Sequence, residues 1–429
     1  MNELRSLFKS IINSAFFKNT IILASGSTIA QAISFVFLII LQRWFYTPAD
    51  FGLLGLYVSL STLIVACSTL KFEYAILLPK KETNAITLIQ LSGISTIVFS
   101  IVIIAIFPLF RGMIPSIPEE DFLLFGFLIT VTIPISGLNE ILTYWYNRKS
   151  KYSKVSVGRI IQNSSTETSR LLMGIATTNG MGLIIGRVFG QLVSMFFLGS
   201  DFFIKNSKQL FNIKISELKK SFKTYIHFPL FTVPTVFVSN FSNLILIALF
   251  FEYYGDASAG LVSISIQYIA LPFGIMSSAF AQVFYKKITL IESKGELLST
   301  YTKFAKTLGL ISLAIVILVY LIPNSLIIGV IGPKWNGLTE FMKLSVLWQS
   351  IAFISSSLSF IYTRLMRQQT MILFALLQLI LVYTTLRFGN VYFEDALQTF
   401  TVYVIGQCVY YFITIIAANH FIKRSPLLM

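Results

Sequence analysis

Four polar side chains lie along one flank of residues 153–178, a stretch long enough to cross a bilayer. Arg159, Asn163 and Glu167 follow one another at intervals of four residues, and Arg170 comes three residues later. At about 100° per residue, Arg159 and Arg170 point within roughly 20° of each other around a helix. A guanidinium group can clamp a phosphate through two parallel donors. The spacing therefore predicts one wall of a polar pathway that could bind an anionic group.

Most of the other charges within apolar runs also fall in the first half of the chain. Ionisable groups at membrane depth cost on the order of 2.5–3.5 kcal/mol each, so they normally face a bundle interior or an aqueous cavity. In this region arginines outnumber carboxylates, which suits a phosphate. The candidates for substrate binding are Arg159, Arg170, Arg187, Arg43 and Asn163, those for ion coupling are Glu140 and Glu167, and the second half offers a polar lining from Asn240, Asn243 and Gln267.

Each candidate also has a purely structural interpretation, which stays open at this stage. Glu167 and Arg170 form an i,i+3 pair and could neutralise each other. Asn163, like the amides of the second half, could hydrogen-bond a neighbouring helix. Arg187 lies near a span end and could snorkel to the interface. Arg43 and Lys71 are close enough to the surface to act as anchors.

The elements that must position these residues are membrane-spanning helices. The chain of 429 residues is 55% hydrophobic, and its mean hydropathy is +0.78. Apolar runs of about 20 residues, separated by short basic loops, indicate a polytopic helical bundle. A net charge of +15 would suggest nucleic acid in a soluble protein. Here the basic residues cluster in loops, so the topology rule explains them and no nucleic acid partner is expected.

We predict an all-α integral membrane protein with about twelve transmembrane helices. Most of the 33 basic residues fall in alternate loops, which places those loops and both termini in the cytoplasm. The predicted spans are residues 20–41, 51–70, 86–109, 122–144, 154–177, 182–203, 228–251, 259–281, 304–331, 339–362, 370–388 and 397–421.

A basic hydrophilic connection divides these spans six and six. We expect an N-terminal lobe over residues 1–204 with an amphipathic helix at 2–17, a cytoplasmic linker at 205–226, and a C-terminal lobe over 227–429. An even number of spans per lobe implies a parallel repeat, related by a pseudo-two-fold axis along the membrane normal. The stretch FYTPADFGLLGLY aligns with YYGDASAGLVSIS, which pairs Tyr46 with Tyr254 and Gly52 with Gly260. A double lysine follows the next span in both copies.

No enzyme signature is present in the sequence. Gly-rich pieces such as Gly180 to Gly182 lack the lysine–serine ending of a phosphate-binding loop. His227 and His420 have no metal-ligand or triad spacing around them. We therefore expect a transporter without catalytic residues, metal or cofactor. Its energy would come from an ion gradient, the membrane potential or downhill flow of substrate.

Several stretches resemble the polysaccharide transporter family of Wzx-type lipid-linked oligosaccharide (O-antigen) flippases, in the multidrug/oligosaccharidyl-lipid/polysaccharide (MOP) exporter superfamily. The stretches lie in both halves, at residues 23–57, 72–92, 182–194, 255–287 and 332–348. The resemblance implies two six-helix lobes of the MATE/MOP type around a cavity. Family members have a cationic lumen, and only Arg43 in QRWFY and Arg187 in GLIIGR match the positions that carry the resemblance.

The resemblance also implies the substrate. It would be an undecaprenyl-diphosphate-linked oligosaccharide repeat unit, moved by alternating access from the inner to the outer leaflet of the bacterial inner membrane for O-antigen, capsule or exopolysaccharide synthesis. Membrane lipids, a polysaccharide polymerase and chain-length machinery are the expected partners. A MATE-like drug/cation antiporter is the first alternative, although it would need a cavity dominated by carboxylates. A membrane-embedded O-antigen polymerase or ligase, or a passive scramblase, are the others.

Overall fold

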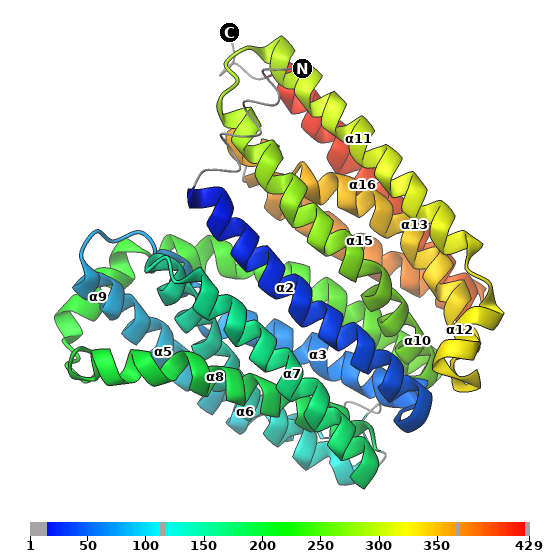
Figure 1. Ribbon diagram of the computed structural model, residues 1–429, viewed down its shortest axis with the longest axis horizontal. Helices are drawn as coiled ribbons and strands as arrows, with labels where there is room; N and C mark the ends of the chain where they lie inside the picture. The colour runs from blue at the N-terminus through cyan, green and yellow to red at the C-terminus, as the bar shows by residue number, and fades with distance from the viewer. Residues whose placement is uncertain are drawn as a thin grey trace. The chain divides into compact units, whose positions relative to one another are not determined.

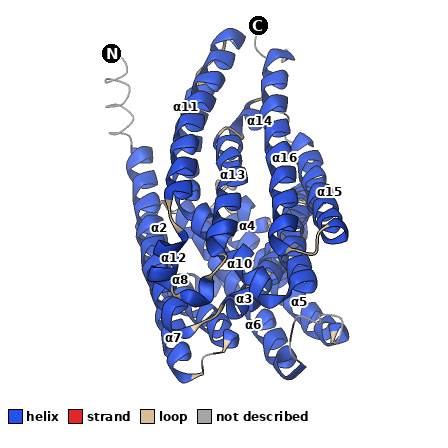
Figure 2. Ribbon diagram, turned by 90° about the vertical axis from the view of Figure 1, so that its right-hand side faces the viewer, coloured by secondary structure: helices blue, strands red, loops and turns tan. Residues whose placement is uncertain are grey.

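The computed structural model describes residues 15–111, 117, 119–177, 179–365, 367 and 369–424. All regular structure within these ranges is helical (Figure 2). The all-α class is therefore confirmed. The amphipathic helix expected over residues 2–17 lies outside the described residues except for its last three positions, which belong to the first helix.

Among the described residues, ten helices are long and apolar enough to cross a membrane. One of them, Phe228–Thr289, covers two predicted spans, and Gly255 interrupts it with a φ of 79°. The helix α7 (Tyr152–Ala176) has the length of a span, but its polar side chains keep its mean hydropathy low. The protein is thus a multi-pass membrane protein, and each predicted span lies on helical structure.

The chain divides into two compact units. Unit 1 comprises the described residues up to Leu41 together with Leu60–Val236, and unit 2 comprises Gln42–Ser59 together with Phe237 and the described residues that follow. The segment Gln42–Ser59 therefore groups with the second half of the chain. The lobe bounds expected from the sequence stay a prediction.

Unit 1 contains the helices of the first half of the chain (Figure 1). In it α7 packs between α2 and α8, and α6 packs against α5 and α8. The elements are α2 (Ala15–Ile40), the second part of α3 (Pro48–Ser68), α4 (Phe72–Ala75), α5 (Glu82–Ile106), η2 (Phe107–Phe110), α6 (Glu119–Arg148), α7, α8 (Gly180–Phe211), α9 (Ile215–Thr224) and η3 (Phe228–Thr232).

Unit 2 contains the first part of α3 and the helices of the second half. In it α16 packs against α11, α13 and α15. Two elements begin in unit 1 and continue in unit 2, the π-helix η1 (Leu41–Phe45) and α10 (Val233–Thr289). The others are α11 (Lys294–Leu321), α12 (Asn324–Ile331), η4 (Pro333–Trp335), α13 (Leu338–Ser357), α14 (Phe360–Arg364), α15 (Gln369–Tyr392) and α16 (Ala396–Arg424).

The prediction of one continuous helix over residues 304–331 is wrong. The sequence suggests a single helix over residues 304–331, but α11 ends at Leu321 and α12 begins at Asn324. Pro323 causes the break, because the residue before a proline avoids the helical region and Ile322 is extended, with a ψ of 116°. The apolar run is continuous, so hydropathy alone does not detect the end of the helix.

The surface of α5 has the character of a face that meets lipid. Ile97, Ile101 and Ile104 are 57%, 60% and 56% exposed. A contiguous apolar surface of this kind is unusual on a soluble protein, whereas hydrocarbon chains cover it at no cost. The first turns of α5 pack Ile86 and Ile89 into a buried cluster with Trp145 of α6. The later turns of α5 therefore meet lipid, while its first turns pack into unit 1.

Candidate functional site

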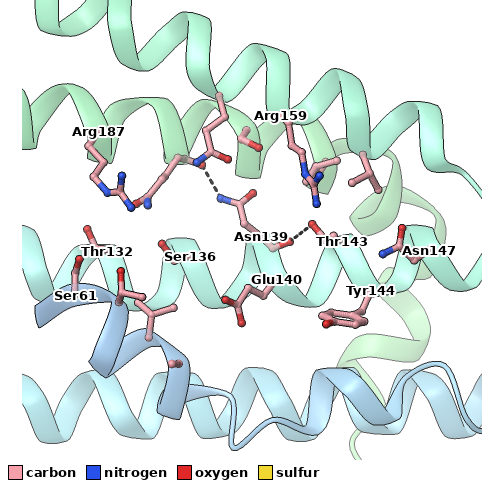
Figure 3. Close-up of a pocket in the computed structure, with 18 of the residues that line it drawn as sticks. Ser61, Thr132, Ser136, Asn139, Glu140, Thr143, Tyr144, Asn147, Arg159 and Arg187 are labelled. Atoms are coloured by element: carbon pink, nitrogen blue, oxygen red, sulfur yellow. Dashed lines mark hydrogen bonds between the residues drawn. The ribbon is translucent and has the colours of Figure 1, made fainter. Parts of the chain in front are cut away.

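A polar cavity of about 510 Å³ lies inside unit 1. Its lining comes from α3, α4, α6, α7 and α8 (Figure 3). The cavity falls in the range of sites that hold a drug-sized ligand. Its lining is Ser61, Thr62, Val65, Ala66, Tyr74, Thr132, Ser136, Asn139, Glu140, Thr143, Tyr144, Asn147, Val155, Arg159, Gln162, Arg187, Gln191, Ser194 and Leu198.

One face of α6 supplies the longest part of this lining. Its polar residues recur every three or four positions, which places them on a single side of a helix. The other side packs Ile141, Leu142 and Trp145 into the buried cluster. The polar face comprises Thr132, Ser136, Asn139, Glu140, Thr143 and Asn147.

Two arginines reach the cavity from α7 and α8. In Figure 3 the side chains of Arg159 and Arg187 extend toward α6, near Thr143 and near Thr132 respectively. Arg159 Nη1 donates to Ser27 Oγ on α2 at 2.5 Å, and its side chain faces no carboxylate within ion-pair distance among the described residues. Its guanidinium therefore keeps donors for a ligand.

The arginines are held in place by the close packing of α7 on α8. A Cβ atom built on Gly190 would lie 1.9 Å from Thr166 Oγ1, and one on Gly186 would lie 2.6 Å from Arg170 Cγ. Small residues let helix backbones approach closely in membranes. Gly186 and Gly190 thus set the separation of α7 and α8, the two helices that carry Arg159 and Arg187.

Among the described residues that line the cavity, Glu140 is the single carboxylate, and a buried lysine matches it. Lys71 Nζ lies 3.6 Å from Glu140 Oε2 and 3.1 Å from Glu73 Oε1. Lys71 is 4% exposed, and its φ of 58° puts it in the left-handed region. Burial alone would lower the pKa of Lys71, but the carboxylates of Glu140 and Glu73 outweigh burial, and the pKa lies above its ordinary value. The lysine therefore stays charged, and the arginines leave the cavity positive.

Several buried polar atoms of the lining have unused hydrogen-bonding capacity. Asn139 Nδ2 donates to the carbonyl of Gln191 at 2.8 Å. Within the described part of the chain, however, no partner is present for Asn139 Oδ1, Ser136 Oγ, Asn147 Oδ1 or Gln191 Oε1. Buried polar atoms are nearly always hydrogen-bonded. These four atoms are therefore suited to the hydroxyl and amide groups of a polar ligand.

The cavity also contains an aromatic surface. The rings of Tyr74 and Tyr144 lie with their centroids 5.1 Å apart, and both residues line the cavity. Aromatic faces next to amides and a carboxylate form an amphipathic surface, apolar on the ring and polar at its edge. A sugar ring has the complementary character, with C–H faces and hydroxyl edges.

Of the four polar residues predicted to share one flank of α7, three do not line this cavity, namely Asn163, Glu167 and Arg170. Arg170 Nη1 lies 3.1 Å from Glu167 Oε1, and Arg170 Nε donates to the carbonyl of Leu183 at 3.1 Å. Both side chains are buried, at 7% and 4% exposed. Asn163 Nδ2 donates to the carbonyl of Ala30 on α2 at 3.0 Å. Asn163 and Arg170 thus bond to neighbouring helices, whereas Glu167 pairs with Arg170 on α7 itself. Substrate binding by Asn163 and Arg170 and ion coupling by Glu167 stay predictions.

The remaining candidates lie in unit 2. Arg43 is exposed and donates to the carbonyls of Gly329 and Val330 at the end of α12, the latter at 2.9 Å. A cation at the C-terminus of a helix satisfies free carbonyls. Asn243 and Gln267 are exposed on α10 and Asn240 is half-buried. Their predicted part in lining a substrate path stays a prediction.

Two parts of the cavity were not predicted from the sequence. The polar face of α6 is visible in the spacing of Thr132, Ser136, Asn139 and Glu140, although only Glu140 was singled out. The interpretation of Lys71 as a surface anchor is wrong, because the turn after α3 folds the lysine back between two carboxylates.

Comparison with known proteins identifies the family. A family described as polysaccharide biosynthesis protein matches residues 40–340. No curated protein sequence matches.

Solved structures match over nearly the whole chain. An inward-facing multidrug resistance MATE family transporter of the MOP superfamily matches with a TM-score of 0.69 at 14% identity, over 92% of this chain and 94% of that one. The lipid II flippase MurJ in an inward closed conformation matches with a TM-score of 0.68 at 15% identity, over 94% and 90%. A MOP superfamily transporter from Pyrococcus furiosus, reported with a binding pocket of reverse polarity, matches with a TM-score of 0.57 at 14% identity, over 96% and 97%. The chain has the fold that these transporters share, and it belongs to the polysaccharide biosynthesis protein family.

Proposed function

We propose that this protein is a flippase that moves an undecaprenyl-diphosphate-linked oligosaccharide from the inner to the outer leaflet of the bacterial inner membrane. The observation that carries the proposal is the cavity of unit 1, in which Arg159 and Arg187 face a lining of hydroxyls and amides. Membership of a polysaccharide biosynthesis family supports a sugar substrate. The likeness of fold to a lipid II flippase supports a lipid-linked one.

The chemistry of such a substrate fits the lining. The arginines would hold the diphosphate through charge-assisted hydrogen bonds. The unused acceptors of Asn139, Asn147 and Gln191 would take sugar hydroxyls. A cavity of about 510 Å³ has room for a diphosphate and about one sugar, since sites of 300–1,000 Å³ hold drug-sized ligands. The rest of the oligosaccharide and the polyprenyl tail would lie outside it.

The physical need for a flippase is the cost of taking the head group through hydrocarbon. Sugar hydroxyls and phosphate charges would lose their hydrogen bonds to water in the membrane core. A polar cavity replaces those bonds while the tail stays in lipid. With an inside-negative potential, each negative charge moved outward gains about 2.3 kcal/mol per 100 mV. We propose alternating access as the route, with a polymerase and chain-length machinery receiving the unit on the far side.

Complementation tests the function directly. The gene would be expressed in strains that each lack one repeat-unit flippase, and surface polysaccharide would be measured by immunoblot. Rescue of one strain by the wild type, and its loss in Arg159→Ala at equal protein level, is the expected result. Resistance to cationic drugs without rescue in any strain would instead favour the drug/cation antiporter.

A further inference from the structure

The short helix α9 (Ile215–Thr224) joins two membrane-spanning parts of the chain. The candidate span of α8 extends to Phe211 and the next candidate span begins at Phe228, so α9 lies close to a membrane surface. Loop charge predicts that this surface faces the cytoplasm. The helix belongs to unit 1, and the proposed binding of substrate in the cavity gives it no role.

Several contacts hold α9 and the chain before it against the bundle of unit 1. The helix packs against α5 (Figure 1), and the ring centroid of Phe222 on α9 lies 5.6 Å from that of Phe72 on α4. At the end of α8, Gln90 Nε2 of α5 donates to the carbonyls of Gln209 and Leu210 at 3.0 and 2.9 Å. A side-chain donor satisfies the carbonyls that a helix end leaves free. The helix α9 is therefore fixed on unit 1 and presents a defined outer face.

The outer face of α9 is basic on one side. At about 100° per residue, Lys219, Lys220 and Lys223 fall within an arc of about 100° around the helix. All three are exposed. Among the described residues no carboxylate lies within ion-pair distance of them, and Glu217 of the same helix pairs with Lys214 at 3.3 Å. Like charges three and four residues apart on a helix repel one another, so this side of α9 favours an anionic partner.

An apolar surface adjoins the three lysines. Ile215, Leu218 and Phe222 fall within an arc of about 60° around the helix. Phe222 packs on unit 1, but Ile215 is 66% exposed, and Phe211 shortly before the helix is 82% exposed. Exposed apolar side chains beside lysines are typical of a helix that lies in the membrane interface. An acidic soluble protein would match the lysines alone, whereas the surface of an anionic bilayer matches both sides of the helix.

We propose that α9 binds anionic phospholipids of the inner leaflet, with its three lysines at the phosphate groups and Ile215 among the acyl chains. Charge complementarity carries the proposal, because an anionic leaflet attracts basic side chains near its surface. Docking on α5 adds to it, since a helix that is already ordered loses little entropy on binding. The inference goes beyond the proposed function, because lipid binding does not require that an oligosaccharide be transported.

Quenching of a fluorescent label by lipid tests this inference on the full chain. Ser216→Cys places one label on the basic side of α9, at an exposed position. The background carries Cys67→Ala and Cys408→Ala, which removes both native thiols. The labelled protein is reconstituted into mixed vesicles of phosphatidylcholine and phosphatidylglycerol, in which one lipid or the other has brominated acyl chains. The two quenching curves give the relative affinity of the α9 surface for the anionic lipid.

We expect the α9 surface to prefer phosphatidylglycerol by at least about fivefold at low salt. The preference should shrink in about 1 M salt, because the screening length falls to about 3 Å. Equal quenching by the two lipids at low salt would overturn the proposal. Quenching by neither lipid would also overturn it, and would leave the lysines to an acidic protein. Because the measurement needs no transport, its failure is distinguishable from failure of the proposed function.

Charge variants separate a site on α9 from the general attraction of basic loops to the membrane. Lys219→Gln, Lys220→Gln and Lys223→Gln, combined in the labelled protein, should bring the preference to within about twofold of equality. A preference that survives this change would contradict the proposal. Thermal unfolding in detergent at the same temperature as the unaltered protein shows that the variant is folded.

The matched control removes the same charge from the start of α11. Lys294→Gln, Lys303→Gln and Lys306→Gln change three lysines of another segment that loop charge predicts to be cytoplasmic. The label on α9 should keep its preference for phosphatidylglycerol in this variant. An equal loss of preference in both triple variants would mean that net charge, rather than the α9 surface, attracts the anionic lipid.

Discussion

The two ends of α7 carry the same residue type in different settings. Arg159 and Arg170 share one flank of the helix, as their spacing predicts. Arg159 lines a polar cavity and bonds to Ser27, whereas Arg170 is buried against Glu167 and the carbonyl of Leu183. Spacing along a helix therefore fixes the face on which a charge lies, but the neighbouring helix decides whether that charge meets a cavity or a partner.

The largest expected effect is on stability and concerns Arg170, which is paired with Glu167. Arg170→Ala would leave the buried carboxylate of Glu167 without its ion pair, which costs about 3–5 kcal/mol when one partner of a buried pair is removed. We expect a sharp fall in membrane-inserted protein, measured by immunoblot and by thermal aggregation of detergent extracts. The double variant Glu167→Leu with Arg170→Leu should recover much of the loss. A stable Arg170→Ala that fails only in transport would mean that Arg170 contacts substrate.

The next largest effect is on transport and concerns Arg159, which lines the cavity. Arg159→Ala removes a charge-assisted contact worth about 1.5–3 kcal/mol, so transport should fall roughly ten- to a hundredfold while the protein level stays unchanged. Arg159→Lys should recover part of the activity, because it keeps the charge but loses the two parallel donors. Surface polysaccharide per copy of protein is the measurement. Unchanged transport in Arg159→Ala would remove Arg159 from the substrate site.

The lysine that balances Glu140 gives a prediction with a defined pH dependence. The pKa of Lys71 is raised by the carboxylates, so its contribution to stability is fully present below the ordinary lysine pKa of about 10.4 and is lost only as pH rises beyond it. Between roughly pH 8 and 9.5, still below the ordinary lysine pKa, Lys71→Met should therefore destabilise the protein by a constant amount. Thermal unfolding of both proteins across that range is the measurement. A difference that is already lost at about pH 9, well under the ordinary lysine pKa, would show that the charge of Lys71 is not what stabilises the turn.

The positions of the helices follow from the sequence, whereas some breaks and side-chain partners do not. Apolar runs and loop charge predict the helices, because transfer of a span into hydrocarbon depends on composition rather than on neighbours. The same reasoning misses the break at Pro323, which is a backbone effect inside an apolar run. It also misplaces Lys71, because a left-handed turn folds that residue back toward Glu73. Arg159 and Arg187 line the polar cavity, and their contact with substrate stays a prediction. No spacing within α7 reveals the pairing of Arg170 with Leu183 on α8.

The smallest expected effect concerns Asn163, which lies between the two ends of α7. Its amide donates to the carbonyl of Ala30 at 3.0 Å, and hydrogen bonds between membrane helices average about 0.6 kcal/mol. Asn163→Leu should thus lower thermal stability slightly and leave transport within about twofold of the wild type. Asn139→Leu is the matched comparison, because its amide also bonds to a neighbouring helix but its Oδ1 faces the cavity without a partner among the described residues. A similar loss of stability in both variants, with loss of transport only in Asn139→Leu, would locate substrate recognition on α6. Loss of transport in Asn163→Leu as well would extend the substrate path along α7 toward Arg170.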